Sequence, residues 1–397
     1  MTMPNDMTKQ AQRARDRRSF LKQAARLSVA AGAATLTPWH LDLFAQGPSA
    51  ERRLVRSARP QDLETPVGLF DNWITPNDLF YVRSHLYTPT ISLSDWTLTV
   101  DGLVDEPLKL TMDDLRKLPE ATIVATLECA GNGRAFFDPP VAGIQWERGA
   151  VGNARWTGVR LADVLKRAGS KAGAKFVWCD GADVPVGTVP DFIRQVPIMK
   201  AFDGDTLLAY AMNGVPLPVA NGFPLRLIVP GWEAAYSVKW LTHLTVADKE
   251  HDGFFVQGAY RYPNRRPAPG TTVDAKDMSP LGGMVVKSMI TAPADGAAHP
   301  RGVVVIRGFA WAGEATITRV EVSTDNGSTW SDARLGTDEA RWAWRAFQYY
   351  WDAREVGSFV IHARAHDNQG RVQPITALWN PNGYLWNAVD RVRINIG

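Results

Sequence analysis

The pattern of the chain changes at about residue 272, and this change most constrains the possible fold. Residues 263–269 hold three prolines and two arginines, which is typical of a linker. Beyond them, short β-rich runs follow one another, and Asp325-Asn326-Gly327 is a strong hairpin signal. About seven short strands in about 120 residues predict an all-β, immunoglobulin-like sandwich over residues 272–397. The clearest expected strands are Gly302–Ala312, Thr316–Thr324, Arg341–Trp351 and Ser358–Asp367.

A different pattern precedes the linker. Over residues 76–265, short β-rich runs alternate with turns and a few helical segments. Leu161–Ala168 has apolar residues at helical spacing and is followed by Gly169, a helix stop signal. Residues 219–229 (VANGFPLRLIV) predict a turn followed by a buried strand. Because 397 residues exceed one ordinary core, we predict an α+β domain over 76–265, separate from the sandwich.

The N-terminal segment has the pattern of an export signal. Arg17-Arg18-Ser19-Phe20-Leu21-Lys22 is a twin-arginine pattern, and an Ala-rich apolar run follows it. We therefore expect a signal peptide over residues 1–45, an extended lead-in over 46–75, and a periplasmic protein. The signal segment is basic, whereas the rest of the chain is nearly neutral, so overall charge does not favour nucleic-acid binding. No run of 18 apolar residues is present, so we expect no membrane span.

The cysteines limit the chemistry. With only Cys129 and Cys179, the chain cannot carry a disulfide-rich scaffold, a structural zinc cage or an iron–sulfur site, and it has no Cys-x-x-Cys-His haem motif. Cys129 lies in LECAGNGR, at the expected end of a strand and five residues before Arg134. A cation near a thiol favours the thiolate. Pattern alone leaves four interpretations open: a buried structural cysteine, a hydrolase nucleophile, a ligand to a soft redox metal, or a Cys129–Cys179 disulfide.

A resemblance chooses among these interpretations. CAGNGR, with FYVRSH at Phe80–His85 upstream and NGFPLRLIVPGW…SVKWL at Asn221–Leu241 downstream, resembles the sulfite oxidase family of molybdenum enzymes. These blocks keep the order and spacing of the family over about residues 60–397. The resemblance implies a mixed molybdopterin-binding domain followed by a dimerisation domain.

The resemblance also implies roles for individual residues. Cys129 corresponds to the thiolate that binds molybdenum, and thiolates suit a soft, high-valent metal. The catalytic positions implied with it are Arg83, His85, Arg134, Trp146, Tyr260 and, as a third pocket arginine, Arg391. The positions implied to contact the molybdopterin are Tyr81, Arg83, Ser84, His85, Cys129, Asp183, Asn221, Arg226, Ser237, Val238 and Lys239.

Three of these positions depart from the family pattern. Ser84 stands where the family often has Asn, and Asn221 and Ser237 stand where animal members typically have His. The last two replacements still donate hydrogen bonds. Arg226 and Lys239 suit a phosphate, one as a planar fork and the other as a point charge.

The resemblance implies a periplasmic sulfite dehydrogenase with one molybdopterin per subunit and no haem of its own. Its electrons would pass to an external c-type cytochrome, and two chains would form a homodimer. The main alternative is the sulfane dehydrogenase subunit of the thiosulfate-oxidising multienzyme system. From other classes, a Cys129 hydrolase and a sandwich-type binding protein remain as alternatives. We expect His362 and His366, on one face of a strand, to form hydrogen bonds rather than to bind a metal.

Overall fold

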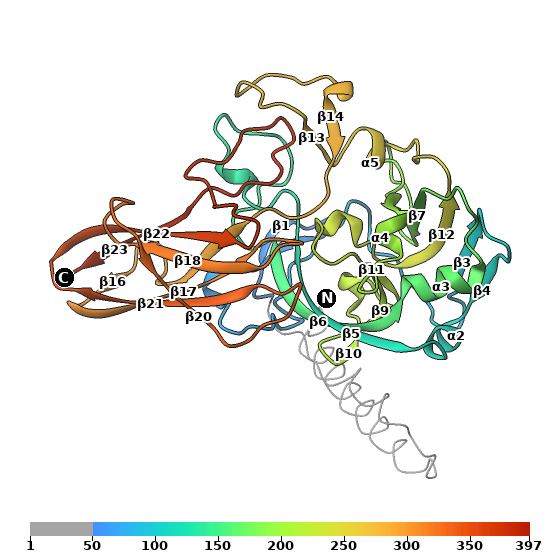
Figure 1. Ribbon diagram of the computed structural model, residues 1–397, viewed down its shortest axis with the longest axis horizontal. Helices are drawn as coiled ribbons and strands as arrows, with labels where there is room; N and C mark the ends of the chain where they lie inside the picture. Colours follow the sequence, from blue (N-terminus) through green and yellow to red (C-terminus); the bar gives the residue numbers. More distant parts are fainter. Residues whose placement is uncertain (1–50) are drawn as a thin grey trace, which may run out of the picture. The chain divides into compact units, whose positions relative to one another are not determined.

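The computed structural model describes residues 51–397, so the predicted signal peptide and the first part of the lead-in lie outside the described residues. Residues 52–397 form one compact unit, which is mostly β (Figure 1). The α-helices found in this unit are short, and the broader α+β description is not confirmed. They are α2 (Met112–Arg116), α3 (Leu161–Ala168), α4 (Ile198–Ala201) and α5 (Phe254–Gln257). None of the helices in the described part is long and apolar enough to cross a membrane.

Two five-stranded sheets build the first half of this unit. One has the order β10-β9-β6-β5, with β11 also paired to β9, and the other has the order β4-β3-β12-β7-β8. The first consists of β5 (Glu120–Glu128), β6 (Val151–Arg160), β9 (Leu207–Met212), β10 (Val215–Pro216) and β11 (Arg226–Ile228). The second consists of β3 (Leu98–Gly102), β4 (Leu108–Leu110), β7 (Phe176–Gly181), β8 (Arg194–Pro197) and β12 (Leu241–Ala247).

Helix α3 shows how the sequence pattern fixes one element of this half. It covers the predicted residues, and Leu161, Val164 and Leu165 on its apolar face are fully buried. Gly169 ends the helix with a φ of 68°, a left-handed conformation that glycine adopts without steric cost. The predicted turn and buried strand at residues 219–229 are also present, as a 3₁₀ turn over Val219–Asn221 followed by β11.

Short paired strands flank this half. Strand β1 (Leu54–Ser57) pairs with β2 (Asp62–Glu64), and β13 (Arg261–Pro263) pairs with β14 (Met278–Pro280). Both pairs are antiparallel. The second pair spans the predicted linker, so part of that segment is ordered as a hairpin-like ribbon.

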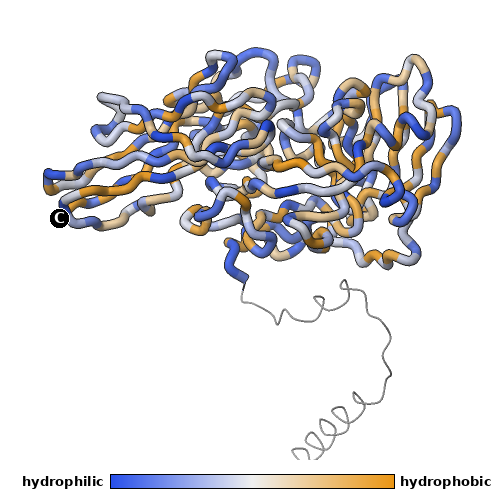
Figure 2. Tube along the Cα trace, turned by 60° about the horizontal axis from the view of Figure 1, so that its bottom comes forward, coloured by the Kyte–Doolittle hydropathy of each residue, from blue (hydrophilic) through white to orange (hydrophobic). Residues whose placement is uncertain are grey.

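The C-terminal half consists of two packed sheets, drawn in orange and red in Figure 1. Their orders are β15-β17-β21-β20 and β16-β23-β22-β18-β19. The first contains β15 (Lys287–Ala292), β17 (Gly302–Trp311), β20 (Arg334–Leu335) and β21 (Arg345–Ala353). The second contains β16 (Ala298–His299), β18 (Ile317–Ser323), β19 (Ser331–Asp332), β22 (Gly357–Asp367) and β23 (Asp390–Ile396). Hydrophobic and hydrophilic residues alternate along these strands, as Figure 2 shows.

The predicted strands of this half are found with one shifted boundary. Strands β17, β18 and β22 lie where the sequence predicts them, and the Asn326-Gly327 turn joins β18 to β19 with positive φ at both residues. Strand β21 begins at Arg345 rather than Arg341. Residues 342–344 instead contact β5: Thr126 N–H donates to Trp342 O, and Trp344 N–H donates to Thr126 Oγ1.

A buried ion pair joins the two halves beside Cys129. Lys287 Nζ, at the start of β15, donates to Glu128 Oε1 at 2.8 Å and to Asn132 O at 3.1 Å. Trp311 Nε1 donates to the other carboxylate oxygen of Glu128 at 2.7 Å. Glu128 and Lys287 are 4% and 2% exposed, so the pair is desolvated and fully hydrogen-bonded. The last residue of β5, which precedes Cys129, is therefore fixed by the sandwich.

A second buried carboxyl lies near this pair. Glu233 is 1% exposed, and its Oε2 has no hydrogen-bond partner among the described residues. Burial, together with the negative charge of Glu128, raises the pKa of Glu233 well above its usual value, and Lys287 opposes this rise. Burial without a hydrogen-bond partner for Oε2 thus favours the neutral form of the Glu233 carboxyl.

Replacing Lys287 with Met should destabilise the chain, because it leaves the Glu128 carboxylate buried without a cation. We expect a loss of about 3 kcal/mol or more in the free energy of unfolding, measured by urea denaturation. The matched control is Lys276→Met, since Lys276 pairs with Asp274 at the surface. The control should change the free energy of unfolding by less than about 0.5 kcal/mol. Equal effects of the two substitutions would contradict the role of Lys287.

Glu233→Gln should raise the melting temperature more at high pH than at low pH. The native state holds the Glu233 proton more tightly than the unfolded chain does. Wild-type stability therefore falls as the pH rises from the unfolded pKa toward the folded pKa, and a neutral amide removes this loss. Melting temperatures at about pH 5 and about pH 8 test this. Glu355→Gln, at an exposed position, is the control. A gain from Glu233→Gln that does not depend on pH would disprove the buried neutral carboxyl.

Candidate active site

One cavity brings most of the predicted site residues together. The segments that line it are the residues before His85, the end of β5, the loop after β7, and the residues from Ala220 to Trp240. Predicted residues in its wall are Tyr81, Arg83, Ser84, His85, Cys129, Asp183, Asn221, Arg226, Ser237, Lys239 and Tyr260. Val238 is buried between two of them but does not line the cavity.

Cys129 lies in the cavity wall directly after β5. Its backbone N–H donates to Ala150 O, which extends the β5–β6 ladder by one residue. Its thiol is 9% exposed and free, as is that of Cys179, so the two cysteines form no disulfide. Burial raises the pKa of the Cys129 thiol and outweighs the opposing positive charges of Arg83 and Arg134, so the nearby arginine does not favour the thiolate as the sequence predicted.

Arg83 is held in place by a buried carboxylate. Its NH1 donates to Asp62 Oδ1 at 3.1 Å and to Ser84 O at 2.5 Å. Asp62 is 1% exposed and also accepts from the Ser84 backbone N–H. A quarter of the Arg83 side chain remains accessible. Asp62, in the lead-in, is thus a positioning residue that sequence reasoning did not identify.

Tyr260 and His85 form a hydrogen-bonded pair in the cavity. The Tyr260 hydroxyl lies 2.7 Å from His85 Nε2. Phe192 stacks on the His85 ring with the centroids 4.2 Å apart. Burial, followed by the charge of Arg83, lowers the pKa of His85 well below its usual value. A neutral imidazole whose Nε2 accepts from Tyr260 is the arrangement that these contacts favour.

Two further cationic side chains of the cavity, Arg226 and Lys239, donate hydrogen bonds mainly to carbonyl oxygens. Arg226 donates to Ser237 O at 3.2 Å and to Asn221 O at 3.1 Å, and burial lowers its pKa to about 10. Lys239 Nζ donates to Ser84 Oγ at 2.8 Å and to Ala220 O at 3.0 Å. Burial, together with Arg226, lowers the pKa of Lys239 well below its usual value. Neither side chain has a carboxylate within ion-pair distance in the described residues, so both can pair with a phosphate.

Asp183 lies in the same cavity wall. Burial raises its pKa to about 6, and Lys239 opposes this rise. It is the acidic residue predicted for the cofactor site, and a carboxyl near this position accepts hydrogen bonds from a ligand when ionised.

Arg134 and Trp146 do not line the cavity, but they pack near the loop that carries Cys129. Arg134 NH1 donates to Ile144 O at 2.9 Å, and its NH2 donates to Asn382 O at 3.2 Å. The guanidinium packs so closely against Gly131 that a Cβ there would lie 2.6 Å from it. Trp146 is fully buried in the same apolar cluster as Cys129, and its indole N–H has no partner among the described residues.

These residues fit the molybdopterin implied by the sequence. The structure offers a buried thiol, an unpaired indole N–H in the same apolar cluster, and two cations whose partners are carbonyl and hydroxyl oxygens. Such a set of donors suits an anionic cofactor that carries a thiolate-binding metal. Among the described residues no group of three or more His, Cys, Asp or Glu forms an independent metal site.

The structure does not bring Arg391 to this cavity. It lies on β23, where its side chain is exposed and faces His362 on β22. The C-terminal segment that reaches the Cys129 loop is instead residues 382–386. Leu385 N–H donates to Ala130 O, and Tyr384 stacks on Tyr260 with the centroids 5.4 Å apart. Arg391 is therefore outside the cavity wall of this structure, and its role as a third pocket arginine stays a prediction.

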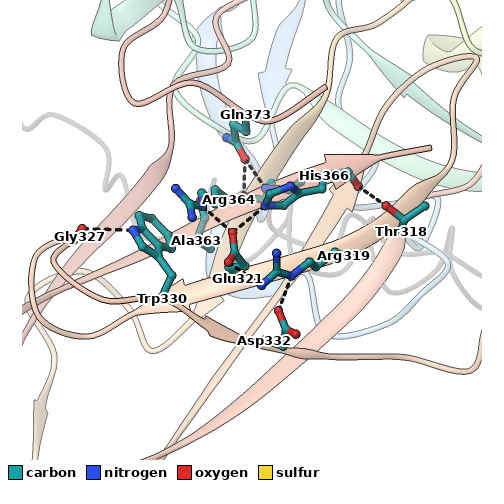
Figure 3. Close-up of polar contacts among 12 residues, drawn as sticks. Thr318, Arg319, Glu321, Gly327, Trp330, Asp332, Ala363, Arg364, His366 and Gln373 are labelled. Carbon is teal, nitrogen blue, oxygen red and sulfur yellow. Dashed lines mark hydrogen bonds and ion pairs between the residues drawn. The ribbon is translucent and has the colours of Figure 1, made fainter. Parts of the chain in front are cut away.

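His366, on β22 of the sandwich, takes part in a polar network. Figure 3 shows the buried Glu321 carboxylate between the Arg364 guanidinium and the His366 ring. Glu321 Oε2 lies 2.6 Å from both Arg364 Nε and His366 Nε2, and Arg319 pairs with Oε1 at 2.7 Å. His362 lies outside this network, with the Trp330 ring 6.3 Å away.

Comparisons with known proteins agree with the geometry. Residues 85–255 match the family described as the oxidoreductase molybdopterin binding domain, and residues 280–397 match the Mo-co oxidoreductase dimerisation domain. A mitochondrial sulfite oxidase of Drosophila melanogaster is 38% identical over 86% of this chain and 62% of its own length. The sulfite oxidase of Arabidopsis thaliana is 33% identical over 86% of this chain and 94% of its own length.

A solved structure, the sulfane dehydrogenase SoxCD from Paracoccus pantotrophus, matches with a TM-score of 0.76 at 29% identity. The match covers 91% of this chain and 96% of that one. This chain spans less than two thirds of the Drosophila and Rattus norvegicus sulfite oxidases, at 62% and 65% of their lengths. From the two family matches and the identity to the Arabidopsis enzyme over nearly its full length, we conclude that this chain belongs to the sulfite oxidase family of molybdopterin-binding oxidoreductases.

Proposed function

We propose that this protein is a molybdopterin-dependent sulfite dehydrogenase that oxidises sulfite to sulfate. The observation that carries the proposal is the position of the Cys129 thiol, in one cavity wall with Arg83 and the Tyr260–His85 pair. The relatives that are named sulfite oxidases support the choice of substrate. When bound, the molybdenum centre supplies two-electron oxidation and oxygen transfer. Sulfite and water would give sulfate, two protons and two electrons.

We assign one group of residues to the cofactor and another group to the substrate. Cys129 would bind the molybdenum, and Arg226 and Lys239 would hold the pterin phosphate with Asn221, Ser237 and Asp183 near it. Arg83 would bind the sulfite oxygens by charge-assisted hydrogen bonds, because its guanidinium is fixed by Asp62 and remains partly accessible. Tyr260 would turn its single hydroxyl proton from His85 Nε2 to a substrate oxygen when sulfite is bound.

The electron acceptor proposed is an external c-type cytochrome. The sequence has no Cys-x-x-Cys-His motif, and one of its two cysteines is assigned to molybdenum. The match of residues 280–397 to a dimerisation domain supports a homodimer. We also propose the periplasm as the location, from the twin-arginine pattern. The domain limits of 76–265 and 272–397 and the immunoglobulin-like description of the sandwich stay proposals.

A second candidate is sulfane dehydrogenase, which the likeness to SoxCD favours. The two activities differ in the form of the substrate, since one is a free oxyanion and the other is sulfur bound to a carrier protein. Reduction of cytochrome c by free sulfite with the isolated protein supports sulfite oxidation. Reduction that requires a carrier-bound sulfur substrate supports the second candidate. A cysteine hydrolase is disfavoured, because no hydrogen bond joins the Cys129 thiol to a histidine within residues 51–397.

Cys129→Ser should fold like the wild type, but sulfite-dependent cytochrome c reduction should fall by at least about 100-fold. A serine oxygen is a hard ligand and a poor replacement for thiolate on this metal. Cys179→Ser is the matched control, because Cys179 is buried outside the cavity and should keep its activity. Turnover of Cys129→Ser at the rate of the control would rule out Cys129 as the metal ligand.

Replacing both Arg17 and Arg18 with Lys should keep a folded, molybdenum-loaded protein in the cytoplasm. Twin-arginine export carries folded proteins, so cofactor insertion precedes transport. Fractionation of the cells, followed by molybdenum analysis and activity assays of each fraction, tests this. Equal periplasmic activity of the double variant and the wild type would mean that another export route is used.

A further inference from the structure

One buried arginine beside the cavity has no acidic partner. Arg194 is the first residue of β8 and is 2% exposed. Its Nε has no hydrogen-bond partner, and no carboxylate of residues 51–397 lies within ion-pair distance of its guanidinium. Burial of a cation without a carboxylate is expensive, so other groups must offset the cost, and one of them is the Tyr236 hydroxyl, which accepts a hydrogen bond from Arg194.

The neighbours of Arg194 are aromatic rings of the active site. The guanidinium carbon lies 4.6 Å from the centroid of the Tyr236 ring and 4.8 Å from that of Tyr260. Both distances are within the range of cation–π attraction, which offsets part of the cost of burial. The Tyr260 hydroxyl is the group that hydrogen-bonds His85 in the cavity wall. Arg194 therefore contacts both tyrosine rings, and Tyr260 links it to the cavity wall.

The charge of Arg194 reaches the cavity. After burial, the charges of Arg83, Lys239 and Arg194 all lower the pKa of His85. Arg83 is partly neutralised by Asp62, at 3.1 Å, whereas Arg194 has no such partner. Phe192, two residues before Arg194, stacks on His85 and lines the cavity. The same short segment therefore places an aromatic ring in the cavity wall and a positive charge beside it. Sequence reasoning placed the third pocket arginine at Arg391, which the structure leaves at the surface.

We propose that Arg194 is the third cation of the oxyanion pocket and acts on the bound anion through Tyr260. It is a positioning residue. Its guanidinium, in contact with the Tyr260 ring, makes the Tyr260 hydroxyl a stronger hydrogen-bond donor. Its charge also adds positive potential to the cavity. This rests on the proposed function, because it assumes a small oxyanion as substrate. It predicts a preference for dianions such as sulfate and sulfite, since the attraction of a fixed charge grows with the charge of the ligand.

The test is sulfate binding to the molybdenum-loaded, full-length protein, measured by isothermal titration calorimetry at fixed ionic strength. The variants are Arg194→Gln, which removes the charge, and Arg194→Lys, which keeps it. Arg345→Gln is the control, because Arg345 also has a buried, unpartnered Nε but lies in the sandwich and pairs with Glu339. Methanesulfonate is titrated in parallel as a monoanion of similar shape.

Arg194→Gln should weaken sulfate binding at least about ten-fold and methanesulfonate binding only about three-fold, because the interaction scales with ligand charge. Arg194→Lys should recover most of the sulfate affinity, and Arg345→Gln should keep all of it. In the sulfite assay the loss should appear mainly in KM rather than in kcat. If Arg194→Lys loses as much sulfate affinity as Arg194→Gln, or Arg194→Gln binds sulfate as the control does, the charge of Arg194 does not act on the anion.

The outcomes also separate this inference from the proposed function. A wild-type protein that binds sulfate but does not oxidise sulfite would overturn the proposed function, while the effect of Arg194 on sulfate affinity would still stand or fall by itself. Normal sulfite turnover in every variant, with unchanged KM, would overturn the role of Arg194 and leave the proposed function intact.

Discussion

The buried contact among Glu128, Lys287 and Trp311 is the interaction on which the site depends. It joins the last residue of β5 to two strands of the sandwich, directly before the cysteine that faces the cavity. A desolvated ion pair contributes little to stability when it is intact, but removal of one partner leaves a buried charge. The pair therefore ties the position of Cys129 to correct packing of the two halves. The C-terminal segment also holds this loop in place, because Leu385 and Asn382 form hydrogen bonds with residues that follow Cys129.

Several buried cations in and beside the cavity have no carboxylate partner among residues 51–397, and such cations suit an anionic ligand. Arg134 and Arg226 bond to backbone carbonyls, and Arg194 is held by two tyrosine rings. Buried cations of this kind are stable when anions complete the site. A pterin phosphate near Arg226 and a sulfur oxyanion near Arg83 would supply those charges. The unpaired buried cations and the negative charge of the proposed ligands therefore both support an oxidoreductase that acts on small anions.

The sequence predicts best what lies within contiguous motifs. Cys129, Arg83 and Lys239 each lie in a long block with fixed spacing, and all three line one cavity. Helix α3 and the Asn326-Gly327 turn were predicted because periodicity and local turn preferences decide them. The start of β21 was predicted four residues early, since its first residues bond to β5, which no local pattern indicates.

The remaining site residues could not be predicted, because tertiary contacts define them. Arg391 alternates with the buried Val392 on β23 and so points to the surface, which strand period indicates only once the pairing is known. Arg194 and Glu233 lie outside the motifs, and only their burial without partners distinguishes them. One sequence pattern could have indicated Arg194. Phe192 and Arg194 are two residues apart, so in an extended segment their side chains lie on the same face.

The central claim is that one molybdopterin binds in this cavity with Cys129 as its metal ligand. The most direct measurement is the molybdenum and pterin content of the protein purified from a host that makes the cofactor. X-ray absorption at the molybdenum edge, on the wild type and on Cys129→Ser, then counts the sulfur ligands. The account predicts about one molybdenum and one pterin per chain, and one sulfur ligand fewer in the variant. A protein without molybdenum, or the same number of sulfur ligands in both proteins, would contradict it.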